Sequence, residues 1–367
     1  MVVFPFLEFI SLFYIPAVID TDQKLNAFLP RIRSADWIAL DTEADSLHAY
    51  PEKLCLVQIS LPGEDELLDP LSEANLKPIF DLLSTRELIL HGADYDLRLL
   101  RKTCGFVPAA IFDTMLASRL LGCREFGLNS LVSNYLKVTL EKGPQKANWA
   151  QRPLTQRMAE YARNDTHYLK PLADLLQKQL REKGRLAWHR ETCDCLIKDC
   201  AQIRPSDPDV VWRVKGSHRL APPALGVLRA IWHWRETEAV GANKPPYFVL
   251  PPETMVDLAD AAVQSRSLKE ILPRHISPRR RQGILEAIEK GLAAEKLPVV
   301  LRSQPYRQSE SEKRRMQELE KIRDRRAAEL DIDPTLIASR AMLVLLAKDR
   351  AKHEQELMKW QRELLTP

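Results

Sequence analysis

The sequence predicts an α/β domain with a mixed sheet flanked by helices, followed by all-α helical modules. Three observations support this fold class. Residues 36–70 contain runs that alternate as strands joined by short turns. Helical patterns then predominate to about residue 200, interrupted by short apolar runs. Beyond residue 216 the patterns are helical apart from one linker, and a chain of 367 residues is expected to form two or three domains.

Local signals give the order of elements in the first domain. The run ELILHGAD predicts a short buried strand that leads into the helix YDLRLLRKTCG, which Gly105 ends. The run AAIFDTMLASRLLG predicts the end of a strand, a helix cap at Asp113 and a helix that ends at Gly122. We assign residues 1–200 to this domain.

The remainder of the chain is divided by segments rich in proline and polar residues. Residues 201–216 predict a linker, and LPVVLRSQPYRQ predicts a second one. We therefore expect one helical domain at 217–297 and another at 298–367.

The apolar N-terminus MVVFPFLEFISLFYIPAVI could be mistaken for a targeting signal. It has no basic start, and it contains Pro5, Glu8 and Pro16. It is therefore predicted to belong to the first domain rather than to be a signal peptide or a membrane anchor. No membrane partner is expected, and six cysteines without a disulfide framework favour a reducing cytoplasm.

The net charge of +4 is mild, but its distribution along the chain is uneven. The first hundred residues contain 7 Lys and Arg against 17 Asp and Glu, whereas the second hundred contain 17 against 10. An acidic patch beside basic surfaces suits a cation-dependent enzyme that acts on a polyanion.

Four carboxylates and one tyrosine lie at positions from which they can converge. Asp41 and Glu43 are two apart in a strand pattern, so both side chains point to the same face of the sheet. Tyr161 and Asp165 are four apart in a helical pattern, so they share a helix face. Asp96 lies near the first turn of a helix that follows a buried strand.

Such a set of oxygen ligands, without Cys or His, suits Mg²⁺ or Mn²⁺ rather than Zn²⁺. Two such cations can clamp the attacking and leaving oxygens of a phosphodiester during in-line displacement. A tyrosine hydroxyl beside the cations can hydrogen-bond the attacking water and aim it. The pattern predicts phosphodiester hydrolysis.

The same stretches carry a family resemblance. LDTEADSL, LILHGADYDLRLL with IFDTMLASRLLG, and YARNDTHYL resemble the three motifs of the DEDD exonuclease superfamily, in its tyrosine-bearing branch. Residues 217–295 resemble an HRDC domain, and IRDRRAAELDIDPTLIASRAML resembles a second, more divergent HRDC-like domain. This order of modules is similar to that of the bacterial ribonuclease D family and covers nearly the whole chain.

The resemblance implies a ribonuclease H-like exonuclease domain followed by two HRDC-type helical domains. It implies 3′→5′ removal of nucleotides from structured RNA ends, notably tRNA precursors, with two divalent cations, Mg²⁺ or Mn²⁺. Asp41, Glu43, Asp96 and Asp165 would hold the cations, with Asp41 bridging them, and Tyr161 would orient the attacking water. Leu40 and Ala44 stand where the family often has aromatic residues, but these differences leave the metal chemistry intact.

Several neighbouring residues have structural interpretations. Asp113 is expected to cap a helix, and His91 is expected mainly to form structural hydrogen bonds. Asp94 lies two positions before Asp96, so a helix turns it about 200° away. His48 and His91 are nevertheless candidates for lining a nucleic-acid cleft.

Basic residues in the first helical module are a second candidate nucleic-acid site. Arg279, Arg280 and Arg281 lie at an expected helix start, where helix N-termini and arginines both favour phosphate. Trp212, Trp232 and Trp234 are expected to pack in the core rather than to stack on bases.

The leading hypothesis is therefore a cytoplasmic, monomeric exoribonuclease that takes RNA 3′ ends. Two alternatives remain open, a DNA 3′→5′ exonuclease with the same chemistry and a catalytically silent nucleic-acid-binding protein. The sequence does not fix the preference for sugar, because contacts to a 2′-hydroxyl depend on the shape of the pocket.

Overall fold

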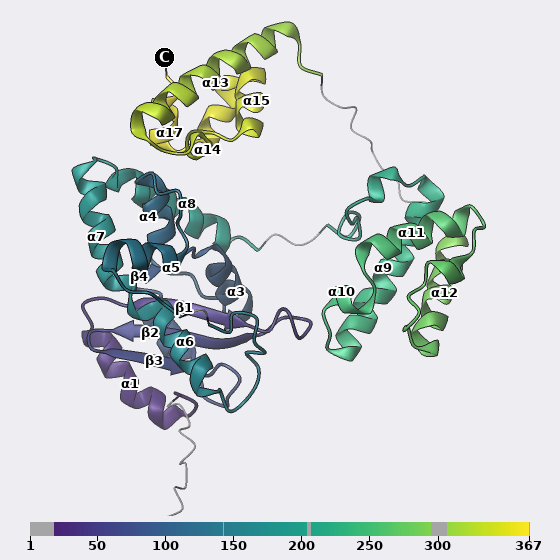
Figure 1. Cartoon of the computed structure of the whole chain (residues 1–367), viewed down its shortest axis with the longest axis horizontal. Coiled ribbons are helices and arrows are strands. Elements are labelled where there is room, and N and C mark those ends of the chain that lie inside the picture. The colour runs from purple at the N-terminus through teal and green to yellow at the C-terminus, as the bar shows by residue number, and fades with distance from the viewer. Residues whose placement is uncertain (1–17, 142, 204–206, 295–306, 367) are drawn as a thin grey trace, which may run out of the picture. The chain divides into compact units, whose positions relative to one another are not determined.

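The computed structural model describes residues 18–141, 143–203, 207–294 and 307–366 (Figure 1). The chain forms two compact units. The first combines Met1–Ala44, Leu54–Ala201 and Glu310–Pro367, and the second combines Asp45–Lys53 with Gln202–Ser309. The interpretation of residues 1–17, and most of the second predicted linker, lie outside the described residues.

A five-stranded mixed sheet is the centre of the first unit, in the order β3-β2-β1-β4-β5. Strand β1 pairs antiparallel with β2, which pairs antiparallel with β3, whereas β4 is parallel to both β1 and β5. The strands are β1 (Ala39–Ala44), β2 (Leu54–Leu61), β3 (Glu64–Leu68), β4 (Glu87–Leu90) and β5 (Ala110–Asp113). The predicted mixed sheet is confirmed.

Helices flank this sheet, as Figure 1 shows. They are α1 (Asp22–Ser34), α2 (Lys77–Leu83), α3 (Asp94–Cys104), α4 (Thr114–Leu120), α5 (Leu128–Leu131), α6 (Gln156–His167), α7 (Leu169–Glu182) and α8 (Leu186–Ala201), with a short π-helical turn at Val132–Leu136. Gly105 ends α3 with a left-handed φ of 71°, a conformation that glycine adopts at low cost. Asp113 caps α4, as the sequence predicts.

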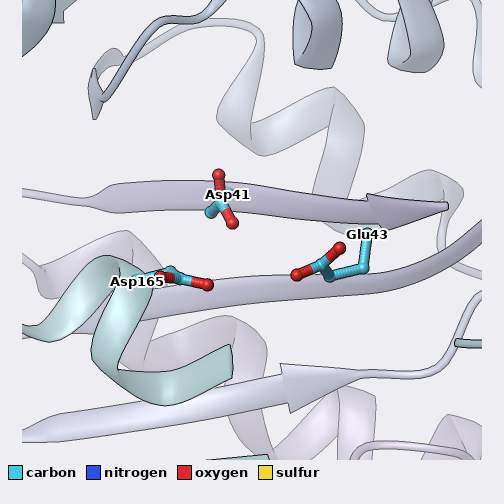
Figure 2. A group of neighbouring side chains, drawn as sticks. All are labelled: Asp41, Glu43 and Asp165. Atoms are coloured by element: carbon cyan, nitrogen blue, oxygen red, sulfur yellow. The ribbon is translucent and has the colours of Figure 1, made fainter. Parts of the chain in front are cut away.

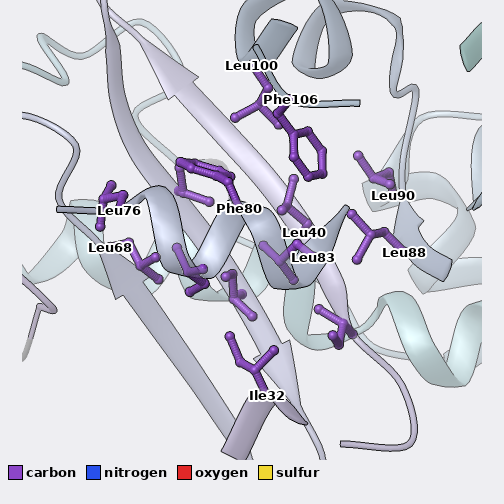
Figure 3. Packing of buried hydrophobic residues seen from close by; sticks show 14 of the residues in the cluster. Ile32, Leu40, Leu68, Leu76, Phe80, Leu83, Leu88, Leu90, Leu100 and Phe106 are labelled. Carbon is purple, nitrogen blue, oxygen red and sulfur yellow. The ribbon is translucent and has the colours of Figure 1, made fainter. Parts of the chain in front are cut away.

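The alternation of β1 sends its side chains into two different environments. Leu40 is fully buried in a core that α1, α2 and α3 form on one face of the sheet (Figure 3). Burying a leucine stabilises a fold by about 2 kcal/mol. Asp41 and Glu43 point to the opposite face, where α6 contacts β1, β2 and β3. The apolar residues of β1 therefore anchor the strand in this core, and its acidic residues lie on the opposite face of the sheet.

The C-terminal helices complete the first unit. They are α13 (Glu310–Leu330), α14 (Pro334–Ile337), α15 (Arg340–Lys348), α16 (Arg350–His353) and α17 (Lys359–Leu364), with a 3-10 turn at Glu354–Glu356. They share one hydrophobic core with α4 and α7. Trp360 stacks on Trp188 of α8 at 5.0 Å between ring centroids, and Arg185 donates to the carbonyl oxygens of Leu120 and Leu330.

The second unit has its own hydrophobic core, to which Trp212, Leu228, Leu258 and Ile284 contribute. Its helices are α9 (Pro222–Ala242), α10 (Pro246–Val249), α11 (Pro252–Val263) and α12 (Pro278–Leu292), with 3-10 turns at Ser217–Arg219 and Leu268–Glu270. The core contains Trp212, and Trp232 and Trp234 pack against it, which confirms the prediction for these residues. Among the described residues, no helix is long and apolar enough to cross a membrane.

Candidate active site

Strand β1 supplies two carboxylates to one face of the sheet. Asp41 pairs with Gln58 across β2, and Glu43 pairs with Leu56. Thr42 lies between them in the strand, and its hydroxyl donates a hydrogen bond to Asp96. The period-two prediction for Asp41 and Glu43 is confirmed.

Helix α6 brings Tyr161 and Asp165 to the same face of the sheet. Thr155 caps the helix start by accepting from the backbone N–H of Met158. Near the other end, the Ser60 hydroxyl donates to Thr166 at 2.7 Å, and both side chains are buried. These contacts fix α6 against the sheet and thereby place Asp165.

The carboxylates of Asp41, Glu43 and Asp165 form a compact cluster, shown in Figure 2. One oxygen from each residue lies within 4.8 Å of the others. Asp96, in the first turn of α3, is not part of this cluster at that distance. Its charge nevertheless raises the pKa of Asp41, Glu43 and Asp165.

The cluster is strongly repulsive when all of its members are ionised. Burial first, and then the charges of Asp165 and Asp96, raise the pKa of Glu43 to about 9. Burial raises the pKa of Asp165 to about 7, and that of Asp96 to about 6. Asp41 is surrounded by the other three, and burial and repulsion by Asp96, Asp165 and Glu43 hold its pKa well above its ordinary value.

This donor set fits a hard divalent cation. The clustered atoms are carboxylate oxygens without sulfur or imidazole nitrogen, which are the ligands that Mg²⁺ and Mn²⁺ prefer. A cation between them would replace mutual repulsion with attraction and allow the carboxylates to ionise at neutral pH.

The Tyr161 side chain is half-buried beside the cluster. Burial first, and then the charge of Asp165, hold the pKa of the phenol well above its ordinary value, so it keeps its proton at neutral pH. A hydrogen bond with Tyr161 lowers the pKa of Asp165, as expected when the phenol donates to the carboxylate. Gln145 also hydrogen-bonds Tyr161.

The neighbouring candidates have clear structural partners. Asp94 pairs with Arg98 at 2.9 Å on the outside of α3. His91 Nδ1 lies 2.9 Å from the hydroxyl of Thr114. His48 belongs to the connection between β1 and β2, in the second unit.

The arginines of the predicted phosphate site form ion pairs. Arg279 and Arg280 both pair with Glu238 of α9, while the Arg279 side chain remains 75% exposed. Arg281 lies in the first turns of α12. No metal-ligand cluster other than the acidic one is found in the described parts of the chain.

Several residues near the site were missed from the sequence. Thr42 had a weak signal, because it stands between two predicted ligands. Gly143 and Gln145 had none, since they lie in an irregular segment whose proximity to Tyr161 depends on the fold. Together with Asn129 and Tyr161 they line a cavity of about 450 Å³.

Comparison with known proteins agrees with this geometry. Residues 16–181 match the 3′-5′ exonuclease family, and residues 224–274 match the HRDC domain. Residues 16–181 therefore resemble a 3′-5′ exonuclease domain, and residues 224–274 resemble an HRDC domain. The exonuclease domain contains the acidic cluster, and the HRDC domain lies in the second unit.

Several relatives of the chain are named ribonuclease D. One, from Zymomonas mobilis, is 37% identical over 66% of this chain and 63% of its own length, so the match spans less than two thirds of that protein. Another, from Desulfotalea psychrophila, is 28% identical over 95% of this chain and 96% of its own.

A solved structure shows the same fold. The crystal structure of Escherichia coli RNase D superposes with a TM-score of 0.72, covering 95% of this chain and 98% of that one at 23% identity. That protein is described as an exoribonuclease involved in structured RNA processing.

Proposed function

We propose that the chain is a metal-dependent 3′→5′ exoribonuclease that removes nucleotides stepwise from RNA 3′ ends and releases nucleoside 5′-monophosphates. The observation that carries this proposal is the cluster of Asp41, Glu43 and Asp165, displayed on an exonuclease domain. Relatives named ribonuclease D support RNA as the substrate.

Each residue has a distinct part in the proposed reaction. Asp41, Glu43, Asp96 and Asp165 would hold two cations, Mg²⁺ or Mn²⁺. When bound, the cations would make a water nucleophilic at neutral pH and stabilise the departing 3′ oxygen. The protonated Tyr161 hydroxyl would hydrogen-bond the attacking water and direct it toward the phosphorus.

Thr42 and the sheet would keep this arrangement rigid. The Thr42 hydroxyl holds one oxygen of Asp96, so Asp96 is presented in a fixed orientation before substrate arrives. Carboxylates that are already oriented need less reorganisation during the reaction, which lowers the barrier.

The helical parts would bind the rest of the RNA, and tRNA precursors are the proposed substrate. His48, His91, Arg279, Arg280 and Arg281 are the proposed contacts with nucleic acid. Because Glu238 pairs with Arg279 and Arg280, RNA phosphates would compete with that carboxylate. We also propose that α13–α17 are a divergent second HRDC-like domain, and that the protein is a cytoplasmic monomer.

A DNA 3′→5′ exonuclease is the second candidate, since the cluster itself does not distinguish the sugars. The test compares an end-labelled tRNA with a 3′ extension and a single-stranded DNA of equal length, in Mg²⁺, in Mn²⁺ and in EDTA. We expect stepwise, chelator-sensitive loss of 3′ nucleotides from the RNA alone. Equal or faster loss from DNA would favour the second candidate, and no loss from either substrate would overturn both.

A further inference from the structure

The segment from Gly143 to Trp149 precedes α6 and lies beside the Tyr161 ring. Trp149 is 1% exposed and packs with Leu154 and Met158, so the end of the segment is anchored in a core. The backbone N–H of Ala147 donates to the carbonyl of Pro144 at 2.8 Å and closes a turn. The segment therefore has a definite shape where it meets the tyrosine.

Gly143 is packed against the Tyr161 ring itself. A Cβ atom at position 143 would lie 1.5 Å from Cδ2 of Tyr161 and 2.3 Å from Cγ and Cε2. A side chain at position 143 would therefore require the ring or the segment to shift. By contrast, a Cβ atom at Gly127 would meet nothing within 4 Å.

Trp149 also lies beside the Tyr161 ring. The ring centroids of Trp149 and Tyr161 are 6.1 Å apart, with the planes tilted by 35°. Such a pair is a favourable aromatic arrangement. The ring thus contacts a buried tryptophan as well as a glycine backbone.

Gln145 interacts with the hydroxyl end of the Tyr161 side chain. It lies inside the turn between Pro144 and Ala147, and its side chain hydrogen-bonds the Tyr161 side chain. This bond lowers the pKa of the phenol, as a donor to the phenol oxygen does. The hydroxyl of Tyr161 thus has a donor in Gln145 and an acceptor in Asp165.

We propose that Gly143 and Gln145 are positioning residues for Tyr161, with Gly143 setting where the ring lies and Gln145 setting where the hydroxyl points. The inference rests on the proposed function, in which Tyr161 orients the attacking water. Both residues also line the cavity of about 450 Å³ beside the tyrosine. If the segment had only a general packing role, substitutions in it would have the same effect whether or not the Tyr161 side chain is present.

The first test is a double-substitution cycle on the hydroxyl. Gln145→Leu is compared with wild type, and Gln145→Leu/Tyr161→Phe with Tyr161→Phe, by steady-state hydrolysis of end-labelled RNA. We expect Gln145→Leu to lower kcat about tenfold with KM for RNA unchanged. In the Tyr161→Phe background the same substitution should change kcat less than about twofold, because no hydroxyl remains. An equal loss in both backgrounds would overturn the role of Gln145.

The second test uses stability and needs no activity. Gly143→Ala should lower the Tm by several degrees, and by clearly more than the control Gly127→Ala, where a Cβ atom meets nothing within 4 Å and only a helix-cap preference is lost. In a Tyr161→Ala background, Gly143→Ala should have no further effect, because the ring that it strikes is absent. If Gly143→Ala leaves the Tm unchanged, or lowers it equally in the wild-type and Tyr161→Ala backgrounds, the role of Gly143 is refuted.

The two tests separate the inference from the proposed function. A wild-type protein that hydrolyses no RNA in Mg²⁺ or Mn²⁺ overturns the function, yet the Tm cycle still decides whether Gly143 sets the ring. If Gly143→Ala does not fold, folding of the Gly143→Ala/Tyr161→Ala protein would support the clash. Failure of both proteins to fold would count against it.

Discussion

At the scale of single residues, the site is dominated by like charge held in a confined space. Asp41 has three other carboxylates near enough to raise its pKa, and burial adds to their effect. A buried carboxylate of this kind destabilises the folded protein when it ionises without a positively charged partner. The acidic cluster is therefore a region where function and stability oppose each other.

Asp41→Asn separates these two effects. We expect kcat for RNA to fall by at least about a thousandfold, because a proposed oxygen ligand of the cations is lost. The same change should raise the Tm of the metal-free protein, since one repelling charge disappears. Hydrolysis assays and thermal unfolding in EDTA measure both. Full activity of Asp41→Asn in Mg²⁺ would show that the ligand set is wrong.

The raised pKa values also predict how stability depends on pH. Glu43 ionises near its ordinary 4.5 when unfolded but at about 9 when folded, so the native state holds the proton more tightly. Metal-free protein should therefore lose stability as the pH rises from about 5 to 9. Thermal unfolding in EDTA at pH 5.5 and 8.5 tests this, and Mg²⁺ or Mn²⁺ should reduce the difference. Glu43→Gln should flatten the dependence, and an unchanged slope in that variant would contradict the assignment.

At the scale of elements, Asp113 connects two helix starts. Its carboxylate accepts from the N–H groups of Gly92 and Ala93 at 3.1 and 2.8 Å, just before α3. It also accepts from Met115 and Leu116 at 2.8 and 3.0 Å, in the first turn of α4. The predicted helix cap is confirmed, and the same carboxylate also holds the start of α3, the helix that carries the proposed ligand Asp96.

Asp113→Ala should therefore lower the free energy of unfolding by more than the loss of an ordinary helix cap does. Four N–H groups would lose a buried acceptor, so we expect a loss of about 3–5 kcal/mol in the free energy of unfolding. Asp333→Ala is the matched control, because the exposed Asp333 caps only the short helix α14, and its loss should cost about 1 kcal/mol. Urea unfolding compares them, and equal costs would show that Asp113 caps α4 alone.

At the scale of the whole molecule, local sequence patterns predicted the clustered carboxylates but few of the contacts between segments that are distant in the sequence. The spacing of Asp41 and Glu43, and of Tyr161 and Asp165, is a property of one strand or one helix. Contacts between distant segments leave no such periodicity. The ring of Tyr161 against Gly143 and the pairing of Arg279 with Glu238 emerge only when the chain is folded.

The place of the C-terminal helices is a further example. The sequence predicts a separate domain at 298–367, whereas contacts group Glu310–Pro367 with the exonuclease domain. The reason is a core shared through pairs such as Trp188 and Trp360, which no local pattern can indicate. The domain boundary itself remains a prediction.

Two separate cores predict two separable unfolding transitions. Trp360 is 2% exposed in the first unit, and Leu228 is fully buried in the second. Each truncation to alanine should cost about 3–5 kcal/mol, because it leaves a cavity that the surrounding side chains fill only in part. Differential scanning calorimetry of the full chain should show Trp360→Ala lowering one transition and Leu228→Ala lowering the other. If both variants shift a single common transition, the exonuclease domain, its C-terminal helices and the HRDC domain unfold as one cooperative body.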